Sequence, residues 1–163
     1  MPSWWASRTR QFRAHLGASV APEERSALAG WTSPPQLALF DSMCVADRRH
    51  GLDVVASLRA ERVTDPDLLI AGLLHDAGKG ETGVWPRVAY ALGQRYGAWV
   101  WRVERMVPGF GAALERLRTH AETSARLAAE AGCSARTEEL IRNQDAPTDP
   151  DFGELLRVAD EAN

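Results

Sequence analysis

The feature that most constrains this chain is an apolar run, residues 68–74, that ends directly on His75 and Asp76. The run follows the sequence DPD at residues 65–67, and a cap residue, an N1 proline and a first-turn acid are typical of a helix start. We therefore expect a buried helix that ends near His75 or Ala77, with Gly78 as its terminator. An imidazole and a carboxylate at the end of a buried helix are costly for folding, and such groups are usually retained for chemistry.

The composition indicates one folded domain of ordinary type. The chain has 163 residues, of which 45% are hydrophobic and 25% charged, and its net charge is −3. Because basic residues are interspersed with acidic ones, we expect no nucleic-acid partner. No apolar run approaches the length of a membrane span, and the first residues lack the apolar core of a signal peptide. Cys44 and Cys133 lie far apart and are expected to be reduced thiols, so we expect a cytoplasmic protein without a membrane partner.

The pattern of helix starts and stops favours an all-α protein. No internal repeat or linker divides the chain, and no strand is strongly indicated, although residues 98–107 alternate in a way that also suits a short strand. The expected helices cover approximately residues 3–16, a short segment from residue 22, 36–43, 45–62, 65–77, 85–95, 112–131 with a break near His120, 134–143 and 151–162.

Five polar residues fall on faces that are otherwise apolar: His50, His75, Asp76, His120 and Asp160. Each of them alone has an ordinary structural explanation, such as a core histidine or a helix cap. Histidines and aspartates drawn from separate helices are, however, typical of a metal site. Mixed nitrogen and oxygen ligands suit a divalent ion such as Mn²⁺, Fe²⁺, Ni²⁺, Co²⁺, Mg²⁺ or Zn²⁺.

The order of these residues resembles the HD-domain superfamily of metal-dependent phosphohydrolases. Residues 47–54, around His50, look like the segment of the first histidine, and residues 73–80 look like the His-Asp doublet of the family. Residues 155–162, around Asp160, look like its last aspartate segment. The resemblance covers about residues 45–163 and implies an HD domain, a single-domain helical bundle. Residues 1–44 are then expected to be an N-terminal helical segment packed on that core.

The resemblance also implies a ligand set and a mechanism. His50, His75, Asp76 and Asp160 would bind the divalent ion, which lowers the pKa of bound water and polarises the phosphorus centre. Asp76 would also orient or deprotonate the nucleophile. Lys79 is the only lysine among 19 lysines and arginines, and its compact ammonium is expected to neutralise charge on the phosphoryl oxygens.

Three further residues are secondary candidates. Arg49 and Arg142 are weaker candidates for gripping substrate phosphate. His120 resembles the additional histidines by which some family members bind a second metal. Related sequences often supply another histidine on the next helix, where this chain has Asn143 and Gln144, and no histidine follows His120. We therefore favour one tightly bound metal with a weak or absent second, which Asp145, Asn143 or water would have to complete.

The predicted activity is hydrolysis of a small phosphorylated metabolite or nucleotide. Two alternatives stay open: a di-iron oxygenase of the same fold, and a non-catalytic module that binds metal or nucleotide. The lack of a GYP-type signature argues against cyclic di-GMP as substrate. Trp85, Trp99 and Trp101 could stack a base, although tryptophans in this setting are more often core residues. The substrate itself and the oligomeric state, including a homodimer, are left open.

Overall fold

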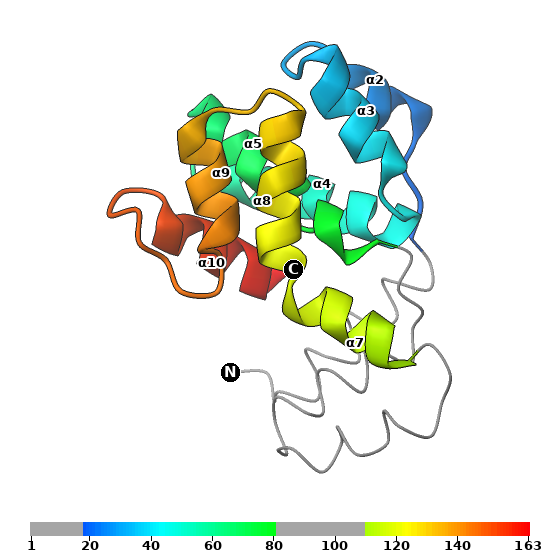
Figure 1. Cartoon of the computed structure of the whole chain (residues 1–163). Coiled ribbons are helices and arrows are strands. Elements are labelled where there is room, and N and C mark those ends of the chain that lie inside the picture. The colour runs from blue at the N-terminus through cyan, green and yellow to red at the C-terminus, as the bar shows by residue number, and fades with distance from the viewer. Residues whose placement is uncertain (1–17, 81–109) are drawn as a thin grey trace.

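The computed structural model describes residues 18–80 and 110–163, which form eight α-helices and one 3₁₀ turn and contain no strand (Figure 1). The predicted all-α class is confirmed for this part of the chain. The predictions for residues 3–16, 85–95 and 98–107, and for the three tryptophans at 85, 99 and 101, lie outside the described residues. In chain order the elements are α2 (Pro22–Leu28), α3 (Pro34–Ser42), α4 (Val45–Ala60), α5 (Pro66–Leu74), η1 (Ala77–Lys79), α7 (Phe110–Arg118), α8 (His120–Glu130), α9 (Ala135–Arg142) and α10 (Gly153–Ala162).

Local capping explains where several helices begin. The carboxylate of Asp65 accepts hydrogen bonds from the first backbone amides of α5, and the hydroxyl of Ser134 accepts one from Thr137 at the start of α9. Ser33 and Gln36 form a capping box at the start of α3. These side chains satisfy backbone donors that have no partner inside the helix, so the predicted starts of α5 and α9 are confirmed.

Helix α5 is the centre of the fold, and every residue from Leu68 to Leu74 is buried. It packs against α4, α9, α10 and α3, and α8 packs beside α9 (Figure 1). No helix of the described ranges is both long and apolar enough to cross a membrane. Because α5 is covered by helices from four parts of the chain, the residues at its C-terminal end reach the interior of the bundle.

Two backbones approach each other closely beside the first histidine. A Cβ atom on Gly51 would lie 2.5 Å from the carbonyl oxygen of Leu73, a distance that real Cβ atoms do not adopt. Gly51 follows His50 on α4, and Leu73 lies two residues before His75 on α5. The missing side chain therefore allows α4 and α5 to come close enough to place both histidines side by side.

The predicted role of Gly78 as helix terminator is wrong. Helix α5 ends at Leu74, close to the predicted His75, and Gly78 lies inside η1, while the left-handed backbone conformation occurs at Gly80, with φ 60°. A Cβ on Gly78 would lie 2.5 Å from the carbonyl oxygen of His120. Gly78 is thus required for the close contact between η1 and α8. The predicted break near His120 is confirmed, and α8 ends at Glu130, just before Gly132 with its φ of 77°.

Candidate metal centre

Three potential ligands converge from three helices. His50 lies on α4, His75 caps the C-terminal end of α5, and Asp160 lies on α10. One ligand atom of each lies within 4.8 Å of the others. Nε2 of His50 is 2.7 Å from Oδ1 of Asp160, and Nε2 of His75 is 3.3 Å from the same oxygen. The structure therefore brings together three of the four residues that were predicted to bind the metal.

The hydrogen bonding of His75 leaves its Nε2 available to a metal ion. Nδ1 of His75 lies 3.0 Å from the carbonyl oxygen of Gly72, and because a carbonyl can only accept, Nδ1 carries the proton. Nε2 of His75 and Oδ1 of Asp76 are 3.5 Å apart, and both are buried atoms without a hydrogen-bond partner. Leaving such groups unsatisfied costs about 1–3 kcal/mol each, and a cation between them would satisfy both. The residues present thus fit a divalent ion.

The opposite charges of the histidine and aspartate side chains in this cluster stabilise each other. Burial lowers the pKa of His75, but the charges of Asp76 and Asp160 outweigh it and raise that pKa to about 9. Burial raises the pKa of Asp160, yet the hydrogen bond from His50 and the positive charge of His75 hold it well below its usual value. The carboxylate is therefore ionised. A proton on His75 provides positive charge in this site, and a bound metal ion would take the place of that proton.

Asp76 is also buried, with 2% of its side chain exposed, and it faces Lys79. Nζ of Lys79 lies 2.5 Å from Oδ2 of Asp76, so the ammonium takes one carboxylate oxygen and leaves Oδ1 towards His75. Burial raises the pKa of Asp76, but the positive charges of His75 and Lys79 outweigh it and hold the pKa below its usual range. The predicted pair of catalytic residues is therefore in contact beside the cluster, although their catalytic roles stay predictions.

His120 lies next to Asp76. Its Nδ1 is 2.8 Å from the carbonyl oxygen of Leu117, and its Nε2 is 3.8 Å from Oδ1 of Asp76. Burial and the positive charge of Lys79 lower the pKa of His120. Within the described ranges the residues with metal-ligand spacing are His50, His75 and Asp160, so His120 borders this group without belonging to it.

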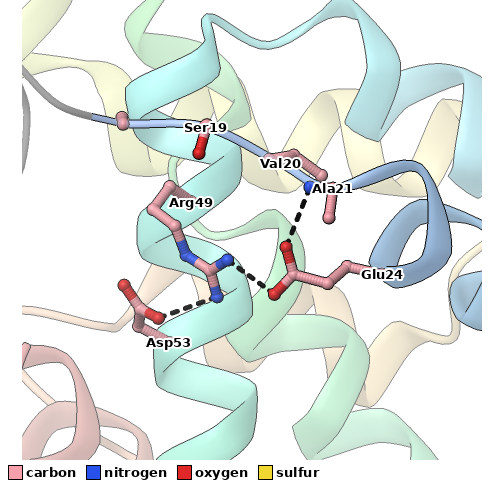
Figure 2. A pocket seen from close by; sticks show the side chains of 7 residues that line it. Ser19, Val20, Ala21, Glu24, Arg49 and Asp53 are labelled. Carbon is pink, nitrogen blue, oxygen red and sulfur yellow. Dashed lines mark hydrogen bonds and ion pairs between the residues drawn. The ribbon is translucent and has the colours of Figure 1, made fainter.

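Arg49, a predicted phosphate contact, is held by two carboxylates. Its guanidinium lies 2.7 Å from Glu24 and 2.8 Å from Asp53, as Figure 2 shows. These side chains line a hollow of about 420 Å³ together with residues 18–21 (Figure 2). His50, the neighbour of Arg49 in sequence, does not line this hollow. A phosphate would have to displace one of the two carboxylates to bind Arg49.

Arg142, the other predicted phosphate contact, is held in a similar way. Its Nε lies 2.9 Å from Glu122 and its Nη2 lies 2.5 Å from Glu138. These pairs join α9 to α8 and to the preceding turn of α9. A phosphate contact at Arg142 would therefore also require competition with two carboxylates.

Two further residues support the site through hydrogen bonds to its backbone. Neither of them was assigned to the site from the sequence. Ser124 is fully buried, and its hydroxyl accepts a hydrogen bond of 2.7 Å from the backbone amide of Gly78. The side chain of Gln144 is buried and donates to the carbonyl oxygen of His75 over 3.3 Å. The sequence marks Ser124 only as a small polar residue one turn after His120. The sequence marks Gln144 only as a departure from the HD-domain pattern that the chain resembles, and nothing there indicates its hydrogen bond to His75.

Comparison of the chain with known protein families, with curated proteins and with solved structures gave no match. Over residues 18–80 and 110–163, the fold and the site together define an all-helical arrangement with a cluster of two histidines and an aspartate that could bind a metal ion.

Proposed function

We propose that this chain is a metal-dependent phosphohydrolase of the HD-domain type, acting on a small phosphorylated metabolite or nucleotide. The observation that carries the proposal is the convergence of His50, His75 and Asp160 from three helices, with the buried and unpartnered Oδ1 of Asp76 beside them. Two histidines and two aspartates in this order are what the resemblance to the HD-domain superfamily implies. A purely structural cluster would be expected to satisfy its own buried polar atoms.

The residues divide into a metal-binding set and a substrate-binding set. His50, His75, Asp76 and Asp160 would hold a divalent ion, which when bound supplies Lewis acidity that activates water and offsets phosphoryl charge. Lys79 binds Oδ2 of Asp76 through its ammonium, and from there it would offset negative charge that builds on the phosphoryl oxygens. In the net reaction the water oxygen forms a bond to phosphorus while the phosphorus–oxygen ester bond breaks, which yields an alcohol and inorganic phosphate.

The test is metal-dependent turnover. Metal-free protein is supplied with Mn²⁺, Co²⁺, Ni²⁺ or Mg²⁺ and assayed on phosphomonoesters and nucleotides, next to an Asp76→Ala variant. We expect turnover that depends on metal and is lost in the variant. A Glu115→Ala variant is the control, because it removes a carboxylate that is 63% exposed on the neighbouring helix α7. If no metal restores activity on any substrate, the proposal is wrong.

The non-catalytic module is the alternative that shares the same site. It predicts that metal binds to His50, His75 and Asp160 without turnover, so the same experiment separates the two functions. The di-iron oxygenase needs a complete second metal site. His120 has Asp76 beside it but is not part of the described ligand group, so no specific observation favours the oxygenase.

A further inference from the structure

Two hydrogen-bond acceptors face each other between Asp76 and His120. Nδ1 of His120 must donate to the carbonyl of Leu117, so the neutral ring presents a lone pair at Nε2. That atom lies 3.8 Å from Oδ1 of Asp76, which has no hydrogen-bond partner. Two acceptors at this separation repel each other unless a donor or a cation lies close to both.

We propose that Nε2 of His120 and Oδ1 of Asp76 together bind the water molecule that attacks phosphorus. His120 is then a catalytic residue of a one-metal site and not a ligand of a second metal; this inference rests on the proposed function. Water has two O–H donors, and two hydrogen bonds of about 2.8 Å reach both acceptors from a point off the line that joins them. Leu117 occupies Nδ1 of His120 and Lys79 occupies Oδ2 of Asp76. The place between Nε2 of His120 and Oδ1 of Asp76 therefore stays open to a water molecule.

The charge at this place favours water over a second cation. The ammonium of Lys79 already binds the other oxygen of the same carboxylate, at 2.5 Å. Its positive charge also acts on the His120 ring. A second divalent ion between His120 and Asp76 would be repelled by this ammonium, whereas a neutral water would not.

The position of His120 is set by a rigid contact between η1 and α8. The amide of Gly78 donates to the buried hydroxyl of Ser124 over 2.7 Å, one turn after His120. Gly78 also lies so close to the carbonyl of His120 that no side chain fits between them. The turn that carries Asp76 and the helix that carries His120 therefore hold each other in place, and catalysis depends on such placement of the reacting groups.

The water site borders the metal-binding cluster. Oδ1 of Asp76 is 3.5 Å from Nε2 of His75, so the same oxygen faces both the cluster and the proposed water. With both O–H groups engaged, a lone pair of the water oxygen is free to point at phosphorus. As the new phosphorus–oxygen bond forms and the ester bond breaks, the water proton leaves along one of the two hydrogen bonds, and the departing oxygen takes up a proton from solvent.

A crystal structure of the Mn²⁺-loaded protein tests this directly, because manganese scatters anomalously and water does not. We expect one anomalous peak, within the group formed by His50, His75, Asp76 and Asp160. We also expect density without anomalous signal within hydrogen-bond distance of His120 Nε2 and Asp76 Oδ1, lost in His120→Ala. An anomalous peak between His120 and Asp76, or no density there, would overturn the inference. This readout is independent of activity, so it distinguishes failure of the water site from failure of the proposed phosphohydrolase function.

Kinetics provide the second readout. In His120→Ala we expect kcat to fall by about 100-fold or more, in the range typical of losing a group that assists proton transfer, while the affinity for Mn²⁺ stays unchanged. His120→Gln retains an acceptor oxygen on the side chain and is expected to recover part of kcat. Equal losses of kcat and of Mn²⁺ affinity in His120→Ala would indicate a metal ligand and contradict the inference. Circular dichroism of both variants verifies that they fold.

Discussion

Nε2 of His50 lies 2.7 Å from Oδ1 of Asp160, although the two residues are 110 positions apart in the chain. The contact exists because α10 packs against both α4 and α5. Asn163, at the end of α10, also donates to the hydroxyl of Ser57 on α4 over 2.8 Å. The aspartate is therefore held against the histidines by the packing of whole helices.

The first prediction concerns the ligand role of Asp160. Asp160→Asn removes the negative charge between the two histidines, and we expect metal affinity to fall by about 100-fold or more, at least the loss seen for residues that only support ligands. Calorimetric titration with Mn²⁺ or Zn²⁺ measures the change. Glu161→Gln is the matched control, because it neutralises the adjacent carboxylate, which is 62% exposed and pairs with Arg157. Equal affinities of wild type and Asp160→Asn would remove Asp160 from the ligand set.

The second prediction concerns stability in the presence of metal. A ligand that binds only the folded protein stabilises it by about 2.7 kcal/mol at 100 times its Kd. We expect Mn²⁺ or Zn²⁺ to raise Tm and a chelator to reverse the effect, because the ion satisfies Nε2 of His75 and Oδ1 of Asp76. Thermal denaturation followed by circular dichroism measures it. The same increase in a His75→Ala variant would show that the metal binds elsewhere.

The third prediction concerns the contact of α4 with α5. Gly51→Ala places a Cβ 2.5 Å from the carbonyl oxygen of Leu73, so the helices must separate, at a cost of about 1–3 kcal/mol as for other overpacked sites. We expect lower stability in urea and weaker metal binding, because His50 moves with the helix. Gly30→Ala is the control, since its Cβ would lie at an ordinary 3.5 Å from the nearest atom. Unchanged metal affinity in Gly51→Ala would mean that the spacing of the helices does not set the ligand geometry.

The fourth prediction concerns the contact of η1 with α8. Ser124→Ala leaves the buried amide of Gly78 without its acceptor, and such a loss costs about 1–3 kcal/mol. We expect this decrease in the free energy of unfolding, measured with urea. Ser26→Ala serves for comparison, because its hydroxyl bonds to the carbonyl of Pro22 in an exposed position and should change stability little. A loss no larger than that of Ser26→Ala would show that the Gly78 amide finds another acceptor.

The fifth prediction concerns acid stability of the segment before α10. Hydrogen bonds from Arg136 lower the pKa of Asp149 from 3.8 to about 2. A lowered pKa in the folded state means that the ionised carboxylate stabilises the fold above pH 3.8 and that this contribution disappears as the pH falls towards 2. We expect Asp149→Asn to be less stable than wild type at neutral pH, with the difference shrinking over that interval. Urea unfolding at a series of pH values measures it, and a pH-independent difference would contradict the assignment.

Local sequence patterns predicted the helices well because their causes are local. Asp65 and Ser134 cap helices through amides two or three residues away, and this reach is visible in the sequence. The position of His50 on an inward face followed from Val54 and Leu58, which are both buried. The role of Gly78 was misjudged, because the atoms that require a glycine there belong to α8 and lie more than 40 positions further along the chain.

The predicted phosphate contacts show the same dependence on residues that are distant in the sequence. Arg49 and Arg142 each have one partner that the sequence shows, Asp53 and Glu138, four residues away on the same helix. Nothing in the sequence indicates that Glu24 and Glu122 reach them from 25 and 20 positions away. The support of His75 by Gln144 spans 69 positions and was equally hidden. Such pairs depend on how helices pack, and a side chain's partners across a bundle leave no periodic trace in the chain.

The sequence by itself determined the all-α class of the part that the structure describes, several helix boundaries and the order of the histidines and aspartates, because helix periodicity and capping act over a few residues. Only the tertiary structure decided which of these residues meet. His50, His75 and Asp160 converge since α5 is enclosed by α4 and α10, and His120 lies beside Asp76 since Gly78 allows η1 to contact the backbone of α8. Close packing of backbones, and not the residue pattern, sets the distances on which the proposed metal binding depends.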